Sequence, residues 1–324
     1  MLIEARDTAA PTASNLNWSA LGDSPGELGP RLLAGLRERG YLRLVGHPLA
    51  ELSGPMFSQA RQLFALPPAV KQSLHIRHST NFRGYSGPGD EFTAERPDYK
   101  ETFDLGLEQA EWDRSGPAYR SLLGSNRWPA QLPEFEPLFR AAMAATLRIG
   151  QTLLACLLDA LGCAAELAAL FEPEPFGLMR LLRYPSMRER PGVARGLGAH
   201  TDYGLFACVL QSEVGGLRAQ SPDGRWRALT PEPEALIVMP GDMLERLTGG
   251  DLRATPHAVE GPTGDAPRYS ISLFVEPSLD ARIAPLVPAV PASGGRGGSP
   301  LIYGEHLYRA LRRSFPRVAA HEPA

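Results

Sequence analysis

The second half of this 324-residue chain reads as short strands between Gly and Pro turns, and this pattern constrains the fold most. The 33 Gly and 31 Pro show no Gly-X-Y period, so they mark turns and exclude a collagen-like helix. Short strands separated by such turns are typical of a barrel or a double-sheet jelly roll. The predicted strands are Leu178–Tyr184, Leu205–Gln211, Gly216–Gln220, Leu236–Met239, Met243–Leu247 and Arg268–Glu276.

Helical patterns dominate the first half. Apolar residues recur there at helical spacing, and Gly or Pro ends each stretch. The longest stretch is rich in Ala and Leu, and we expect it to buttress a sheet. The predicted helices are Glu27–Arg39, Leu52–Leu66, Pro133–Leu161 and Gly304–Arg313, with one further strand at Tyr41–Val45.

The patterns divide the chain into four regions of one compact domain. Residues 1–26 form a loose lead-in, 27–176 a helical N-terminal region, and 177–284 the strand-rich core. Residues 285–324 are a Gly/Pro linker, Pro285–Pro300, and the last helix. Before the longest helix, the Gly-rich loop Asn81–Asp90 leads into Glu91–Asp104, which we interpret as surface or cleft material because it is charged and aromatic.

Composition excludes several classes of protein. The net charge of −3, without a block of Lys or Arg, argues against binding to nucleic acid or a membrane surface. Met1–Asn15 lacks the apolar segment of a secretory signal, and the best apolar run, Leu153–Leu161, is far shorter than the ~20 residues of a membrane span. An odd number of cysteines without a C-x-x-C pair favours a reducing cytosol; they are Cys156, Cys163 and Cys208. We expect a cytoplasmic monomer that acts on a small molecule.

The sharpest chemical feature is His200-Thr201-Asp202. On an extended segment His200 and Asp202 point to the same side, and they offer one imidazole and one carboxylate as metal ligands. His257 is the natural third ligand, because Pro256 before it favours an extended approach. Two His and one carboxylate form the facial triad of non-haem Fe(II) oxygenases. Zinc is an alternative metal, because catalytic zinc also takes three protein ligands. The other alternative is that no metal binds, so that His200 and Asp202 are a surface pair and His257 is an ordinary strand histidine.

Arg268 and Ser270 form a second candidate pair, 11 and 13 residues after His257. On a strand they share one face, and a planar guanidinium beside a hydroxyl suits the capture of a carboxylate. The alternative is an exposed Arg at the start of a strand.

The order of these pieces resembles one family. The segments GAHTDYG at 198–204, VGGL at 214–217, GDM at 241–243, TPH at 255–257 and RYS at 268–270 are similar to those of the isopenicillin N synthase-like Fe(II)/2-oxoglutarate dioxygenases. GYLRLVGH at 40–47 looks like the N-terminal region of that family, and the likeness covers roughly residues 27–316. The resemblance implies an α+β fold, mainly β: a double-stranded β-helix (jelly-roll) barrel buttressed by helices.

The resemblance also implies roles for individual residues. His200, Asp202 and His257 would ligate Fe(II). Arg268 and Ser270 would hold the far carboxylate of the cosubstrate 2-oxoglutarate, and Tyr184 and Arg180 would also contact this cosubstrate. O₂ would be the second cosubstrate. Asp242 matches a turn position, and we interpret it as structural because Gly-Asp is common turn chemistry.

Within the family the chain looks most similar to the microbial ethylene-forming branch. The shared segments are MRLLR at 179–183, RGLGAHTDYG at 195–204, PGD at 240–242, LTGG at 247–250 and YGEH at 303–306. That likeness implies a pocket for arginine or another cationic amino acid, made by Glu91, Thr93, Tyr203 and Arg313. Glu91 could pair with a guanidinium and Arg313 with a carboxylate. The alternative for Glu91 is a solvated loop charge.

Three departures argue against ethylene as the main product. Tyr184 and Ser270 match ordinary hydroxylases of the family, and Gln220–Leu229 is short where the ethylene former has a long insertion. We therefore expect hydroxylation of a small substrate with release of succinate and CO₂. The alternatives are ethylene formation, oxidative tailoring of a natural product, a 2-oxoglutarate-independent oxidase, and a non-catalytic binding module.

Overall fold

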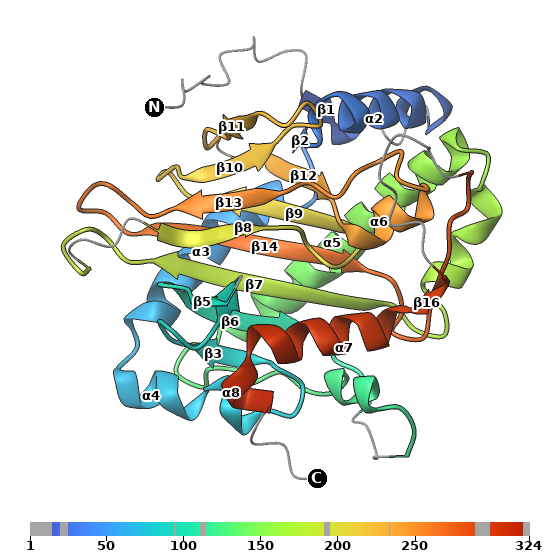
Figure 1. Cartoon of the computed structure of the whole chain (residues 1–324). Helices are drawn as coiled ribbons and strands as arrows, with labels where there is room; N and C mark the ends of the chain where they lie inside the picture. Colours follow the sequence, from blue (N-terminus) through green and yellow to red (C-terminus); the bar gives the residue numbers. More distant parts are fainter. Residues whose placement is uncertain are drawn as a thin grey trace.

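Two facing β-sheets form the centre of the fold in the computed structural model, which describes residues 15–19, 25–93, 95–110, 115–190, 195–232, 234–288 and 299–319 (Figure 1). The larger sheet runs in the order β1 (Asn15–Asn17), β2 (Leu42–Val45), β12 (Leu236–Pro240), β9 (Phe206–Gln211), β14 (Arg268–Glu276), β7 (Phe176–Tyr184), β6 (Glu101–Gly106) and β3 (Gly84–Ser86). The smaller sheet has the order β11 (Trp226–Ala228), β10 (Leu217–Gln220), β13 (His257–Glu260) and β8 (Arg195–His200).

The two sheets confirm the predicted jelly-roll fold. They remain separate among the described residues and do not close into one continuous hydrogen-bonded barrel. Two two-stranded antiparallel sheets stand outside them, β4 (Phe92–Thr93) with β5 (Arg96–Pro97) and β15 (Arg282–Ile283) with β16 (Leu301–Ile302). The lead-in and the linker fall largely outside the described residues.

Helices cover the outer face of the larger sheet. α5 packs on β7 and β14, and α3 packs on β14 beside it (Figure 1). A Cβ at Gly150 of α5 would overlap Val275 of β14, so glycine permits this close approach. The α-helices are α2 (Pro25–Arg39), α3 (Ala50–Ala65), α4 (Pro68–Ser73), α5 (Phe135–Ala160), α6 (Asp242–Leu247), α7 (Tyr303–Ser314) and α8 (Pro316–Ala319). The 3₁₀ turns are η1 (Ile76–His78), η2 (Ala118–Leu122), η3 (Ala164–Glu166) and η4 (Ala168–Leu170).

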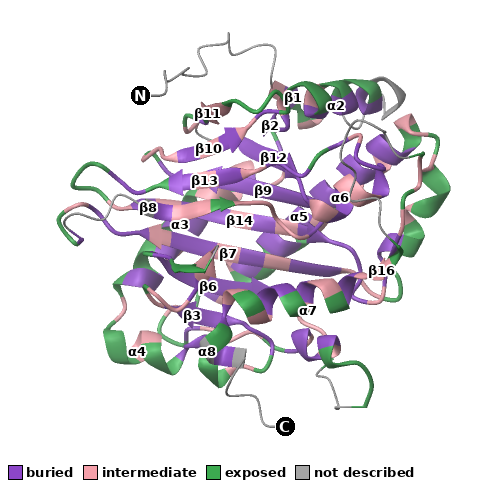
Figure 2. Ribbon diagram, viewed as in Figure 1, coloured by how far each residue is buried: buried purple, intermediate pink, exposed green. Residues whose placement is uncertain are grey.

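Helix α5 corrects the expectation that no apolar segment of this chain is long enough to span a membrane. The helix is long and apolar enough to cross a membrane by length and composition alone, although no run in the sequence suggests this. Most of that apolar stretch, 61%, is buried within the protein, and Figure 2 shows α5 as part of the buried centre. Its apolar character therefore fits a core helix that buttresses the sheet.

One predicted strand is a helix. Met243–Leu247 belongs to α6, which begins at Asp242. Met243, Leu244 and Leu247 are buried and follow helical rather than alternating spacing, with acidic residues in the first turn. The turn interpretation of Asp242 holds only in part, because this residue opens a helix instead of a strand.

A second correction concerns Glu91–Asp104. Its end is strand β6, and all six residues of Glu101–Gly106 are buried between β3 and β7. The charged residues Glu101 and Asp104 conceal this strand in the sequence. They are buried in ion pairs with arginines of β7 rather than facing solvent.

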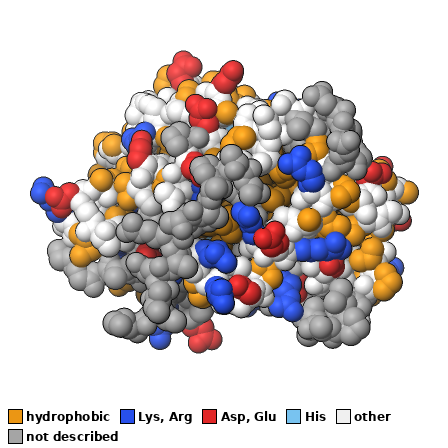
Figure 3. Space-filling view, turned by 90° about the horizontal axis from the view of Figure 1, so that it is seen from above, with side chains coloured by type: hydrophobic (Ala, Val, Ile, Leu, Met, Phe, Trp, Pro, Cys, Tyr) orange, Lys and Arg blue, Asp and Glu red, His pale blue; other side chains and the backbone are white. Residues whose placement is uncertain are grey.

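The surface mixes charges of both signs. On the face seen in Figure 3, Lys, Arg, Asp and Glu side chains lie among hydrophobic ones, and neither sign gathers in one large patch. The only exposed large hydrophobic residue in the described part of the chain is Tyr99.

Candidate active site

Strand pairing brings the two predicted histidine ligands face to face. β8 ends at His200 and β13 begins at His257, and these residues are direct partners in the antiparallel register. Asp202 follows in a bend held by α6, where the Asp242 backbone N–H donates to the Asp202 carbonyl at 2.8 Å. The sheet register and the bend therefore bring residues 57 positions apart to one point.

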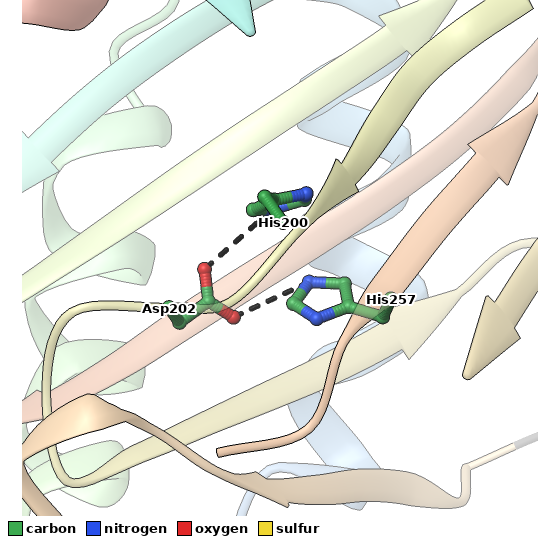
Figure 4. A group of neighbouring side chains, drawn as sticks. All are labelled: His200, Asp202 and His257. Atoms are coloured by element: carbon green, nitrogen blue, oxygen red, sulfur yellow. Dashed lines mark ion pairs between the residues drawn. The ribbon is translucent and has the colours of Figure 1, made fainter. Parts of the chain in front are cut away.

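The three side chains form a compact cluster that could hold a metal ion (Figure 4). One ligand atom from each of His200, Asp202 and His257 lies within 4.8 Å of the others. The Asp202 carboxylate lies 3.8 Å from Nε2 of His200 and 3.3 Å from Nε2 of His257. The described residues contain no other such cluster of His, Cys, Asp and Glu.

Backbone carbonyls orient both imidazoles. Nδ1 of His200 lies 2.9 Å from the Gly198 carbonyl, and Nδ1 of His257 lies 3.0 Å from the Thr255 carbonyl. Donation to these carbonyls places the proton on Nδ1 and leaves the Nε2 lone pair for a metal. Burial, with the neighbouring His257, lowers the pKa of His200 to about 4, so the ring is neutral as a ligand must be.

A cavity of about 710 Å³ opens beside this cluster between the two sheets. That volume lies within the range for pockets that hold small molecules. Every residue predicted for a metal, cosubstrate or substrate role lines it: His200, Asp202, His257, Arg268, Ser270, Tyr184, Arg180, Glu91, Thr93, Tyr203 and Arg313.

Arg268 and Tyr184 make one end of the cavity suitable for a carboxylate. Arg268 is fully buried at the start of β14, which excludes the exposed-arginine alternative, and burial lowers its pKa. Its guanidinium donates to Ser270 Oγ at 3.0 Å and Gln211 Oε1 at 3.1 Å, but among the described residues it pairs with no carboxylate. The buried Tyr184 hydroxyl also lacks a hydrogen-bond partner there. A buried cation without an anion fits the far carboxylate of 2-oxoglutarate.

A buried cluster of five charged residues also borders the cavity, and three of them, Glu91, Asp104 and Arg180, line it. Arg180 contacts Asp104 through Nε at 2.6 Å and Glu91 through NH1 at 2.7 Å. Lys100 Nζ lies 2.9 Å from both Glu91 Oε2 and Asp98 Oδ2. Burial alone would raise the pKa of Glu91, but Arg180 and Lys100 outweigh it and lower that pKa to about 2. Glu91 is therefore an ionised, buried group, and the solvated-loop alternative is wrong.

Arg180 stands apart from the cosubstrate end. The sequence places it among the 2-oxoglutarate contacts, whereas its side chain is engaged by Asp104 and Glu91. Thr93 joins the same wall, because its hydroxyl donates to Asp98 at 2.7 Å.

Sequence reasoning missed Asp98, Lys100 and Asp104. Asp98, Lys100, Thr102 and Asp104 alternate at a period of two, which is the signal of a strand with one polar face. Phe103 and Leu105 on the other face are fully buried. This alternation could have revealed a charged wall inside the protein.

α7 supplies the mouth of the cavity. Tyr203 is joined to this helix by a 3.3 Å hydrogen bond with Ser314. Arg313 is exposed at the end of α7 and has no carboxylate partner in the described residues. Arg313 is therefore a cation at the cavity that has no carboxylate partner within the described part of the chain.

Comparisons with known proteins agree with this geometry. Residues 175–277 match the 2OG-Fe(II) oxygenase superfamily, and residues 16–131 match the N-terminal region of non-haem dioxygenases in morphine synthesis. A 2-oxoglutarate-dependent ethylene/succinate-forming enzyme of Ralstonia nicotianae is 30% identical, with 90% of this chain and 88% of that protein aligned. A homoarginine-6-hydroxylase of Arabidopsis thaliana is 29% identical over 86% of this chain and 87% of its own.

Solved structures share the fold. A 2OG-Fe(II) oxygenase family protein from Caulobacter crescentus is 27% identical with a TM-score of 0.78, covering 96% of this chain and 99% of its own. A full-length Neurospora crassa protein, solved in complex with alpha-KG (2-oxoglutarate), is 25% identical with a TM-score of 0.75 over 92% of this chain and 95% of its own.

Proposed function

We propose that this chain, which belongs to the 2OG-Fe(II) oxygenase superfamily, hydroxylates a cationic amino acid, with arginine or a close homologue as the leading substrate. The enzyme is an oxidoreductase that uses Fe(II), 2-oxoglutarate and O₂. These cofactors, when bound, supply the oxidation of substrate coupled to release of succinate and CO₂. The residues of this chain bind and orient the reactants and exclude water.

The buried charge cluster carries the proposal. Among the described residues it contains three carboxylates, Glu91, Asp98 and Asp104, and two cations, Lys100 and Arg180. Buried carboxylates are costly unless cations surround them, and a substrate cation would add a third cation to the cluster. Each oxygen of Glu91 has one cation neighbour, and a carboxylate can accept about four hydrogen bonds.

Arg313 supplies the complementary charge. A substrate carboxylate at this unpaired guanidinium and a side-chain cation at Glu91 would lay the amino acid across the cavity. Tyr203 would pack beside it. His200, Asp202 and His257 would hold Fe(II), while Arg268, Ser270 and Tyr184 would hold the far carboxylate of 2-oxoglutarate.

The test measures succinate release with Fe(II) and 2-oxoglutarate across arginine, homoarginine, lysine and citrulline. Citrulline matches arginine in shape but is neutral at its end. We expect release with arginine or homoarginine to exceed that with citrulline by at least about tenfold, the least expected when a charge-assisted hydrogen bond is lost. Equal rates with arginine and citrulline would contradict a cationic substrate.

A pair of variants tests whether Glu91 itself, rather than the overall negative charge of the cavity, causes the preference for arginine. Glu91→Gln should remove the preference for arginine over citrulline. Glu95→Gln is the matched control, because Glu95 lines the same cavity but is exposed and outside the cluster. Loss of the preference in both variants would point to overall charge instead.

Ethylene formation is the second candidate, favoured by the 30% identity to the Ralstonia enzyme. Tyr184 and Ser270 argue that it is at most a minor product. Gas chromatography of the same reactions distinguishes the two, since ethylene in place of hydroxylated amino acid would reverse the assignment.

We also propose that the enzyme is a cytoplasmic monomer without a nucleic-acid partner. The three cysteines are free, which fits a reducing compartment. Gel filtration with light scattering should give the mass of one chain.

A further inference from the structure

A row of side chains crosses the inner face of the larger sheet and links the two ends of the cavity. Tyr184 of β7 is the direct partner of Arg268 on β14, and Arg183 of β7 is the partner of Glu101 on β6. Lys100 directly precedes Glu101, so the same register places it beside Tyr184. The cosubstrate end and the substrate wall are therefore neighbours through Tyr184 and Lys100.

Buried carboxylates hold Lys100 in this position. Only 2% of the residue is exposed, and its Nζ contacts Glu91 and Asp98, both themselves buried. An ammonium group has three N–H donors, so two carboxylates leave one donor for a further acceptor. Burying a lysine is costly unless its charge is paired, and Lys100 lies directly behind Glu91, which lines the cavity.

Tyr184 lies between two cations. The Arg268 guanidinium sits over its ring, 5.1 Å from the centroid, and both Arg268 and Lys100 oppose the effect of burial, which raises the pKa of the tyrosine. Its hydroxyl is fully buried, lines the cavity and has no hydrogen-bond partner in the described part of the chain. A phenol can accept one hydrogen bond while donating another.

We propose that Lys100 is a positioning residue that couples binding of 2-oxoglutarate to binding of the cationic substrate. It fixes the Glu91 carboxylate that takes the substrate cation. Its third N–H supports the Tyr184 hydroxyl when that hydroxyl donates to the cosubstrate carboxylate. Each ligand then orders the group that the other needs, and each tightens the other by the same factor. This inference rests on the proposed function.

Anaerobic calorimetry on the Fe(II)-loaded protein tests the coupling. The dissociation constant of 2-oxoglutarate is measured with and without saturating L-arginine, and their ratio is the coupling factor. We expect a factor of about 5 or more in the wild type, in the range usual for coupled sites. Lys100→Met should reduce it to about one, and Tyr184→Phe should do the same because it removes the shared hydroxyl. The double variant should lose no more than either single variant.

Lys71→Met is the matched control. Lys71 also forms a partly buried ion pair, with Glu101 at 2.5 Å, but unlike Lys100 it makes no ion pair with Glu91 or Asp98 among the described residues. It should keep the wild-type coupling factor. Since Lys100→Met leaves two buried carboxylates facing each other, Lys100→Met with Asp98→Asn restores the net charge of the cluster and should fold while still lacking the coupling.

The outcomes separate this inference from the proposed function. A wild-type factor of one, or a factor retained in the Lys100 variants, overturns the inference while both ligands still bind and the function stands. If Lys71→Met loses the coupling factor as fully as Lys100→Met, the inference is also overturned, because a merely structural role of the two lysines would explain both results. Wild-type protein that binds 2-oxoglutarate but no cationic amino acid contradicts the proposed substrate and, with nothing to couple, the inference as well.

Discussion

The metal ligands are contributed by the ends of two paired strands and one bend. Backbone carbonyls hold the imidazoles of His200 and His257, so the fold itself orients both rings. Few side chains bind iron, so the His-x-Asp spacing and a later His were enough to find them in the sequence. Lys100 could not be found that way, because a lysine points to no particular ligand chemistry, and only the alternation of Asp98, Lys100, Thr102 and Asp104 marks it in the sequence.

Removing one ligand should abolish turnover without unfolding the protein. We expect Asp202→Ala and His257→Ala to lose Fe(II) and succinate release, while metal-free melting temperatures stay within a few degrees of wild type. Metal content, succinate and thermal unfolding are measured on the same samples. His78→Ala, at an exposed histidine outside the cavity, is the control. Normal succinate release in either ligand variant would overturn the iron assignment.

Arg268 should act on cosubstrate affinity. Arg268→Met removes the charge but keeps a long side chain, and we expect the dissociation constant of 2-oxoglutarate to rise about 10- to 100-fold. That rise corresponds to the ~1.5–3 kcal/mol of a charge-assisted hydrogen bond. Titration of 2-oxoglutarate by calorimetry measures it, and an unchanged constant would place the carboxylate elsewhere.

At the scale of elements, alternating and helical patterns predicted the longer pieces well. The predicted strands around β7, β9 and β14 and the helix at α5 need only apolar spacing to be found. β6 was missed because Glu101 and Asp104 are paired with Arg183 and Arg180, contacts that only the assembled sheet provides. The α6 segment was misread because five residues hold too little periodicity to separate helix from strand.

The bend after β8 depends on one glycine. A Cβ at Gly204 would overlap the Glu276 carboxylate, which is buried and accepts a hydrogen bond from Tyr303 of α7. Gly204→Ala should therefore shift the bend, displace Asp202 and weaken Fe(II) binding at least tenfold. Gly264→Ala is the control, because nothing lies within 4 Å of its added Cβ. Metal titration compares the two, and equal Fe(II) affinity would show that the bend tolerates the methyl group.

At the scale of the whole molecule, Glu276 makes stability depend on pH. Burial raises its pKa from 4.5 to about 8. Between these values the group is protonated when folded and ionised when unfolded, so its stabilising contribution is complete below pH 4.5 and is lost as pH rises to 8. Glu276→Gln keeps an acceptor for Tyr303 but cannot ionise.

The variant should therefore gain stability relative to wild type on going from pH 5 to pH 8. We expect a gain on the order of 3 kcal/mol, since one pKa unit corresponds to about 1.4 kcal/mol. Urea unfolding at both pH values measures it, with Glu305→Gln on the exposed surface of α7 as the control. If the difference in unfolding free energy between Glu276→Gln and wild type stays constant with pH, Glu276 is ionised in the folded protein.

The pairing of His200 with His257 has a consequence for how the chain is tied together. A metal ion held by these side chains and Asp202 is a removable cross-link, closing a loop of more than 50 residues that includes β9, β10, β12 and α6. Such a cross-link lowers the conformational entropy of the unfolded chain more than that of the folded chain, so it stabilises the folded protein. Iron supply would therefore also set how long the protein survives proteases, so that molecules without iron are the ones removed first.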